Sequence, residues 1–170
     1  MKKRFFIILL ALSVLVLSAC SKREPDFPIC HDIVKAISDN EISLPAGKIY
    51  YKSASAGEDG YIGDGMLSAV FGGGKDLSIF ELWDDIAIFL PSSDHPCEII
   101  AIHCASAIDT SDTALLLLGR LSDVRDAKNA KYPEYFLDCN VFIIKNYVLM
   151  IVSSDVKNAL GVAKETIKGG

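Results

Sequence analysis

Three short segments of the chain place cysteine next to histidine, or one residue from it. They are Cys30-His31, His95-Pro96-Cys97 and His103-Cys104, while Cys139 stands apart. Thiolate and imidazole are preferred ligands of zinc and copper, and thiols also carry redox chemistry. Metal binding and thiol chemistry are therefore the first hypotheses that these residues raise.

Local geometry restricts how these residues can combine. If residues 97–104 form one strand, its ends lie about 23 Å apart, and side chains an odd number of residues apart point to opposite faces. Cys97 and Cys104 can then neither form a disulfide nor share a metal ion. A site would have to combine different strands, for which His103, Cys104 and Cys139 are the candidates. Disulfides, buried free thiols and a metal site all remain open, and no cofactor is predicted.

Two glycine-rich segments resemble ligand loops but lack the required residues. Gly72-Gly73-Gly74-Lys75 is followed by Asp76, where a phosphate-binding loop needs serine or threonine. Asp59-Gly60 and Gly63-Asp64-Gly65 lack calcium-loop spacing and its closing glutamate. We expect a flexible turn and a surface loop.

No catalytic constellation is recognisable, so the sequence predicts no catalytic residues and disfavours an enzyme. The chain has no Gly-x-Ser-x-Gly motif. Asp84 and Asp85 are adjacent, so on a regular strand they point to opposite faces and cannot act together as acid and base. Trp83 near Phe80 either lines a ligand pocket or belongs to the core.

The N-terminus has the organisation of a lipoprotein leader. Met1–Arg4 is cationic, Phe5–Leu17 is apolar, and Leu17-Ser18-Ala19-Cys20 forms a lipobox. The apolar stretch is shorter than the ~20 residues of a membrane span. We therefore predict a signal peptide over 1–19, diacylation of Cys20 and attachment to the extracytoplasmic face of the cell membrane, with residues 20–28 as lipidated cysteine and tether.

The composition of the mature chain fits one acidic domain, placed at residues 29–168. The leader contains three basic residues and no acidic ones, which leaves 14 basic against 22 acidic residues, a net charge of -8. This charge argues against binding to nucleic acid and against flat adsorption to anionic lipid. Contact with the membrane is then expected through the lipid alone.

Hydrophobic periodicity gives the elements of the first half. Residues 29–39 are a short amphipathic helix, 48–52 a strand or extended piece, and 54–65 a loop. Residues 66–71 repeat helically and stop at the glycines beginning with Gly72.

The second half predicts two hairpins, each followed by a helix. The first pairs 85–90 with 98–104, and the second pairs 138–144 with 147–153 through Lys145-Asn146, where Asn146 suits a positive φ. Ser111 should cap a helix to about Lys128, and Ser154-Asp155 a helix to about Ile167. The inward-facing positions expected in these two helices are Ala114, Leu117, Leu118, Leu121 and Val124, then Val156, Ala159, Leu160, Ala163 and Ile167.

These elements predict an α+β fold. It has an antiparallel sheet of about four strands with the helices packed on one face, preceded by an N-terminal helical segment. Residues 141–144 and 148–152 are apolar on both sides, so the second face must also be covered. The cover is either the N-terminal segment or a partner molecule, since an uncovered apolar face would be a large exposed patch.

The order of these pieces resembles a family of small clostridial-type lipoproteins known only as a domain of unknown function. The resemblance rests on the lipobox at Cys20, the strands 85–89 and 98–102, the helix after Ser111 and the hairpin 145–155, and covers about residues 30–167. Four further cysteines and a long glycine-rich stretch at 61–74 depart from the usual pattern. The resemblance implies no activity and no catalytic residues.

Two hypotheses about function follow. The first is a non-catalytic, membrane-anchored domain that binds a protein or a small ligand. The alternative is a metal-binding or thiol-redox envelope protein that uses His103, Cys104 and Cys139.

Overall fold

The structure of the protein, a computed structural model, describes residues 27, 29–40, 44–72 and 77–169. The predicted leader, Cys20, the tether apart from Phe27, and the turn at residues 73–75 lie outside the described residues. In the described ranges, no helix combines the length and apolar content needed to cross a membrane.

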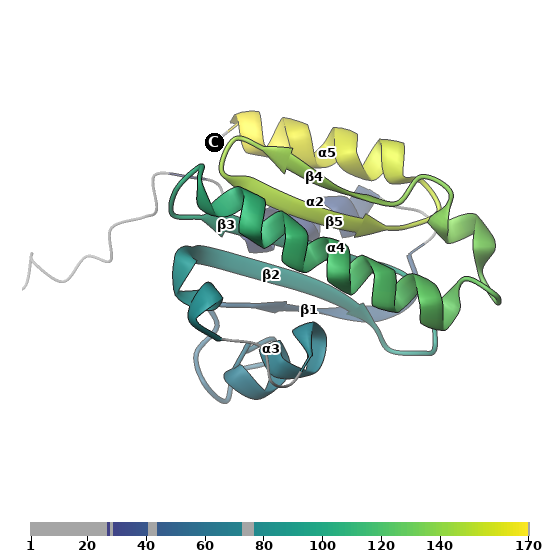
Figure 1. Ribbon diagram of the computed structural model, residues 1–170, viewed down its shortest axis with the longest axis horizontal. Coiled ribbons are helices and arrows are strands. Elements are labelled where there is room, and N and C mark those ends of the chain that lie inside the picture. The colour runs from purple at the N-terminus through teal and green to yellow at the C-terminus, as the bar shows by residue number, and fades with distance from the viewer. Residues whose placement is uncertain (1–26, 28, 41–43, 73–76, 170) are drawn as a thin grey trace, which may run out of the picture.

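Five antiparallel strands form a single sheet in the order β1-β2-β3-β5-β4 (Figure 1). The α+β class is confirmed, and the sheet has five strands because residues 47–51 pair with β2. The elements in chain order are α2 (Cys30–Asn40), β1 (Gly47–Tyr51), α3 (Asp64–Phe71), the 3-10 helix η2 (Leu77–Leu82), β2 (Trp83–Pro91), β3 (Glu98–Cys104), α4 (Asp109–Lys128), the 3-10 helix η3 (Pro133–Phe136), β4 (Asn140–Ile144), β5 (Tyr147–Val152) and α5 (Val156–Gly169).

The helices form layers on both faces of the sheet. Helices α2 and α5 pack against each other on one face, while α4 contacts β5 and β4 on the other face and lies in front of the sheet in Figure 1. The expectation that the helices share one face is therefore wrong. Strands that are apolar on both sides need cover on both, and the helices divide between the two faces.

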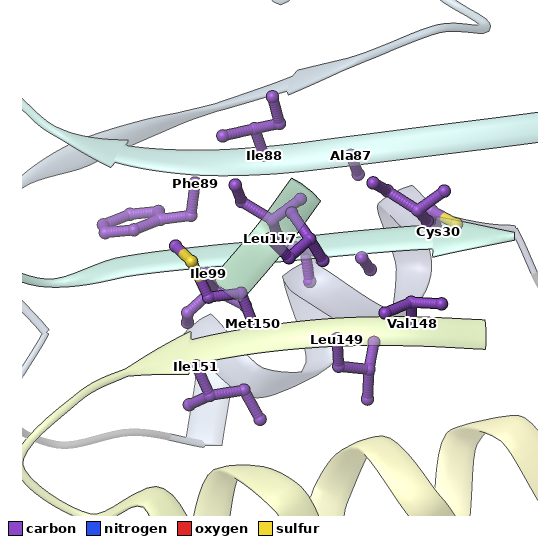
Figure 2. Packing of buried hydrophobic residues seen from close by; sticks show 14 of the residues in the cluster. Cys30, Ala87, Ile88, Phe89, Ile99, Leu117, Val148, Leu149, Met150 and Ile151 are labelled. Carbon is purple, nitrogen blue, oxygen red and sulfur yellow. The ribbon is translucent and has the colours of Figure 1, made fainter. Parts of the chain in front are cut away.

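The cover of the sheet comes from the chain itself. Every residue of β3 and β5 is buried, and Figure 2 shows side chains of β2, β3 and β5 packed with Leu117 of α4 and Cys30 of α2. The N-terminal helix α2 thus supplies the second face together with α5. A partner molecule is not needed to cover this sheet.

The two long helices begin differently. Asp155 caps α5 as expected, because its Oδ1 accepts a hydrogen bond from the Asn158 N–H at 3.0 Å. Helix α4 begins at Asp109, two residues before the predicted cap Ser111. Ser106 Oγ instead donates to Asp109 Oδ2 at 2.7 Å and accepts from the Asp109 N–H at 3.4 Å, which fixes the chain entering the helix.

Two further sequence expectations are corrected. Leu118 of α4 is exposed, because the buried stripe consists of Thr110, Thr113, Leu117, Leu121 and Val124. In the β4–β5 turn the positive φ (54°) belongs to Lys145 rather than to Asn146. A positive φ at the first of the two turn residues is typical of type II′ hairpin turns, which match the twist of the paired strands.

Candidate functional site

The three candidate ligands His103, Cys104 and Cys139 are not brought together. His103 and Cys104 project from opposite faces of β3, since the His103 ring stacks on Phe27 at 3.9 Å whereas Cys104 Sγ donates to Thr113 Oγ1 of α4 at 3.4 Å. Adjacent residues of a regular strand must diverge in this way.

Cys139 lies at the other end of the sheet. It directly precedes Asn140, which pairs with Ile151, whereas Cys104 borders the β4–β5 turn through a hydrogen bond from its N–H to the Asn146 carbonyl. Arg125 Nη2 donates to Cys139 Sγ at 3.3 Å. In the part of the chain that the structure describes, no three His, Cys, Asp or Glu side chains gather as a metal site would require.

The described cysteines form no disulfide with one another, and all of them are buried: Cys30, Cys97, Cys104 and Cys139. Burial, reinforced by the nearby Asp85, raises the pKa of the Cys30 thiol well above its usual value, and burial also raises the pKa of Cys104. Because the thiolate is the reactive form, raised pKa values make these two thiols poor nucleophiles.

A polar cluster that the sequence did not reveal surrounds His103. The pairing of β2 with β3 skips a residue between Trp83 and Asp85, which marks a bulge at Asp84. Asp84 Oδ2 lies 3.2 Å from His103 Nδ1, and Asp85 pairs with His103 across the strands. The expectation that these two carboxylates point to opposite faces is therefore wrong, because the bulge interrupts strand alternation.

This polar cluster joins α2 to the sheet. Asp85 Oδ2 accepts a hydrogen bond from the Cys30 N–H at 2.6 Å and so satisfies the first turn of α2 from a distant strand. The His103 ring lies between Phe27 and Tyr147, whose ring centroid is 4.7 Å away. Burial raises the pKa of both Asp85 and Tyr147. The hydrogen bond to α2 and the enclosure of His103 give the cluster a structural role.

A cavity of about 610 Å³ lies on the α4 side of the sheet, near the β1 edge. Trp83 and Phe80 line it, with ring centroids 4.8 Å apart. The sequence left open whether these two aromatic residues line a pocket or belong to the core, and in the structure they do both. Trp83 is held in place because its Nε1 donates to Thr113 Oγ1 at 2.9 Å. The volume is within the range of about 300–1,000 Å³ that small-molecule sites occupy.

The cavity has an apolar floor and a polar rim. Buried Ile62, Leu67, Trp83 and Ile86 form the floor, and the exposed rim consists of Lys52, Tyr61, Asp64, Ser78 and Glu81. The Lys52 ammonium donates to the carbonyl oxygen of Trp83 at 2.7 Å. Asp64 and Glu81 form no ion pair within the described ranges. The rim therefore carries two carboxylates that a ligand can engage.

The other hollows lack this combination. One of about 710 Å³ lies between α2 and α5 and is lined mainly by polar surface side chains, without aromatic residues. A smaller one of about 290 Å³ borders the ion pair between Arg120 and Glu98. Among these three, the aromatic cavity is the best candidate for ligand binding.

Of the residues that line this cavity, the sequence pointed only to Trp83 and Phe80, as either pocket or core, and it missed the rim. Asp64 stood in a stretch expected to be loop and is the first residue of α3, and Glu81 belongs to the unpredicted η2. The local signal for α3 was Gly72, whose φ of 91° ends the helix as expected.

Comparison of the chain with protein-family profiles, with curated proteins and with solved structures finds no match. The resemblance to small clostridial-type lipoproteins stays a prediction.

Proposed function

We propose that this protein is a lipid-anchored, extracytoplasmic and non-catalytic domain that binds a small ligand in the aromatic cavity. The observation that carries the proposal is the pairing of a buried apolar floor around Trp83 with the free carboxylates of Asp64 and Glu81. A few polar groups beside an apolar floor are the usual composition of a small-molecule site.

Attachment to the membrane is supported by the lipobox and by where the described domain begins. Phe27 packs on His103 beside Tyr147, at the end of the sheet that carries the β4–β5 turn. Cys20 precedes Phe27 by seven residues, which span at most about 25 Å. A lipid on Cys20 would thus hold this end of the domain close to the bilayer.

The charges of the rim favour a ligand with an apolar body and a cationic group. Two carboxylates exceed the single ammonium of Lys52, which is already engaged by the Trp83 carbonyl. Aromatic faces also attract cations, and Trp83, Phe80 and Tyr61 all line the cavity. An amine attached to a ring or a short hydrocarbon matches both features.

Trp83 provides a direct assay because it is the one tryptophan of the chain. The full chain in mild detergent is titrated with benzylamine, benzyl alcohol and benzoate, and Trp83 fluorescence is recorded. We expect saturable binding with benzylamine at least about tenfold tighter than benzoate, which corresponds to about 1.4 kcal/mol.

Matched variants locate the preference. Asp64→Asn and Glu81→Gln should reduce the affinity for benzylamine while leaving that for benzyl alcohol unchanged. Asp112→Asn, an exposed carboxylate of α4 that does not line the cavity, serves as the control. A fluorescence change that does not saturate, or a preference for benzoate, would contradict the proposal.

A further inference from the structure

Strand β4 is an edge strand without the usual protection. It ends the sheet order, and its five residues, Asn140–Ile144, include no charge, proline or glycine. The opposite edge, β1, carries Lys48, which pairs with Asp59, and bridges to Tyr61 through Tyr51. Proteins normally guard exposed edges with charges, proline or a covering segment, because open edges recruit other strands. An edge without charge or proline is open to pairing with another strand.

The outer edge of β4 offers backbone groups for such pairing. In an antiparallel ladder, alternate residues bond to the neighbouring strand and the others direct their N–H and C=O groups outward. Val141 belongs to the outward set, because its N–H donates to the side-chain oxygen of Asn140 at 2.8 Å. Ile143, two residues further on, belongs to the same set.

An exposed apolar flank of α4 lies beside this edge. Leu115, Leu118 and Ile143 are exposed by 67%, 43% and 52%. Arg125 follows Leu118 by two helical turns on the same flank and reaches Cys139, just before β4. Arg120 points the other way, to Glu98 of β3. Leu118 therefore lies on the β4 side of α4, and Leu115 is its exposed neighbour one helical turn earlier.

We propose that β4 pairs antiparallel with β4 of a second copy of this chain, around a twofold axis through Phe142 and perpendicular to the sheet. Val141 of each copy then faces Ile143 of the other, so the outward groups of both strands are satisfied. The axis keeps each face of the sheet continuous, so both α4 helices lie on the same side. A twofold interface of this kind closes on itself.

The strand spacing brings the two α4 helices to packing distance. Helix α4 packs over both β5 and β4, so its axis lies about half a strand spacing inside the edge. With strands about 4.8 Å apart, the two helix axes come to about 10 Å, the upper end of normal helix packing. Leu115 and Leu118 of the two copies would fill this space.

Charge complementarity supports a second copy over an unrelated strand. Lys145 follows β4 and Asp138 precedes it, and both side chains are exposed. Across the twofold axis, Lys145 of each copy lies opposite residue 139 of the other and within reach of its Asp138. In the described part of the chain, neither residue forms an ion pair of its own.

The test is native mass spectrometry of the full chain released from mild detergent, with Ile143→Lys as the disrupting variant. Wild type should appear at twice the mass of one chain, and Ile143→Lys should raise the dissociation constant at least about tenfold. Leu82→Lys is the control. Like Ile143, Leu82 is a partly exposed apolar side chain, but it belongs to η2 and not to β4. Circular dichroism checks that each variant is folded.

A charge exchange keeps the test decisive even if Ile143→Lys fails to fold. Lys145→Glu and Asp138→Lys should each weaken the dimer, and the two together should restore it, because the pairing across the axis is then reversed. A monomeric wild type, an open series of larger masses, or a dimer equally weakened by Leu82→Lys would overturn the proposal. The proposal would also be overturned if the dimer of the double variant were weakened by the sum of the two single effects instead of being restored.

Discussion

Removing the carboxylate of Asp85 should loosen the junction between α2 and the sheet. Asp85→Ala deletes the acceptor of the Cys30 N–H, and Cys30 is fully buried. A buried donor left without a partner costs about 1–3 kcal/mol, partly offset because the carboxylate no longer has to be desolvated. We expect a net loss of about 2 kcal/mol, or roughly 4–8 °C in Tm. Asp85→Asn retains an acceptor oxygen and should lose less than half as much.

The same side chain gives the pH dependence of stability a defined sign. Burial raises the pKa of Asp85 above its ordinary value of 3.8. The folded state then binds its proton more tightly than the unfolded state, so the contribution of Asp85 is fully present below about pH 3.8 and is lost as pH rises through the raised pKa. As the pH rises from about 3.8 through the raised pKa of Asp85, wild type should therefore lose stability relative to Asp85→Asn.

Urea unfolding can be followed by Trp83 fluorescence at several pH values above and below 3.8. It gives the free energy of unfolding of each variant and the change of that free energy with pH. The difference between wild type and Asp85→Asn removes the contribution of the other carboxylates. An Asp85→Ala variant as stable as wild type would refute the role of Asp85 as the partner of α2. A stability difference that grows in favour of wild type as pH rises would refute the sign.

Three further predictions concern packing and buried side chains. Arg120→Ala should cost about 3–5 kcal/mol in urea unfolding, because Glu98 is only 4% exposed and loses its bidentate partner; replacing both residues by leucine should recover most of this loss. Gly47→Ala should destabilise by about 1–3 kcal/mol in the same assay, since its Cβ would lie 2.3 Å from Phe89 Cζ and 2.6 Å from the Leu90 carbonyl oxygen. Cys30, Cys97, Cys104 and Cys139 are buried, so a thiol reagent should modify them in the native protein only as fast as the protein unfolds. Rapid labelling of any of them would instead favour the thiol-redox alternative.

The parts of the fold that depend on local pattern were predictable. The strands predicted at 98–104 and 147–153 match β3 and β5 almost to the residue, and Asp155 gave the start of α5. Their apolar character on both sides also predicted that both faces of the sheet are covered. In each case the signal lies within one short stretch of chain.

The errors arose where distant segments decide the outcome. The side of the sheet on which α4 lies follows from the route between β3 and the edge strand β4, which no local pattern encodes. The bulge at Asp84 depends on the register between β2 and β3, and it is what places two carboxylates beside His103. The rim of the cavity likewise joins Lys52, Asp64 and Glu81 from three separate segments of the chain.

Intact mass spectrometry tests whether the protein is attached to the membrane through Cys20. The full chain and Cys20→Ser are expressed in a bacterium that processes lipoproteins, and the membrane fraction is analysed. We expect a chain that begins at Cys20 and carries diacylglycerol, while Cys20→Ser remains uncleaved and without lipid. A wild-type chain that keeps residues 1–19, or one cut elsewhere without lipid, would contradict it.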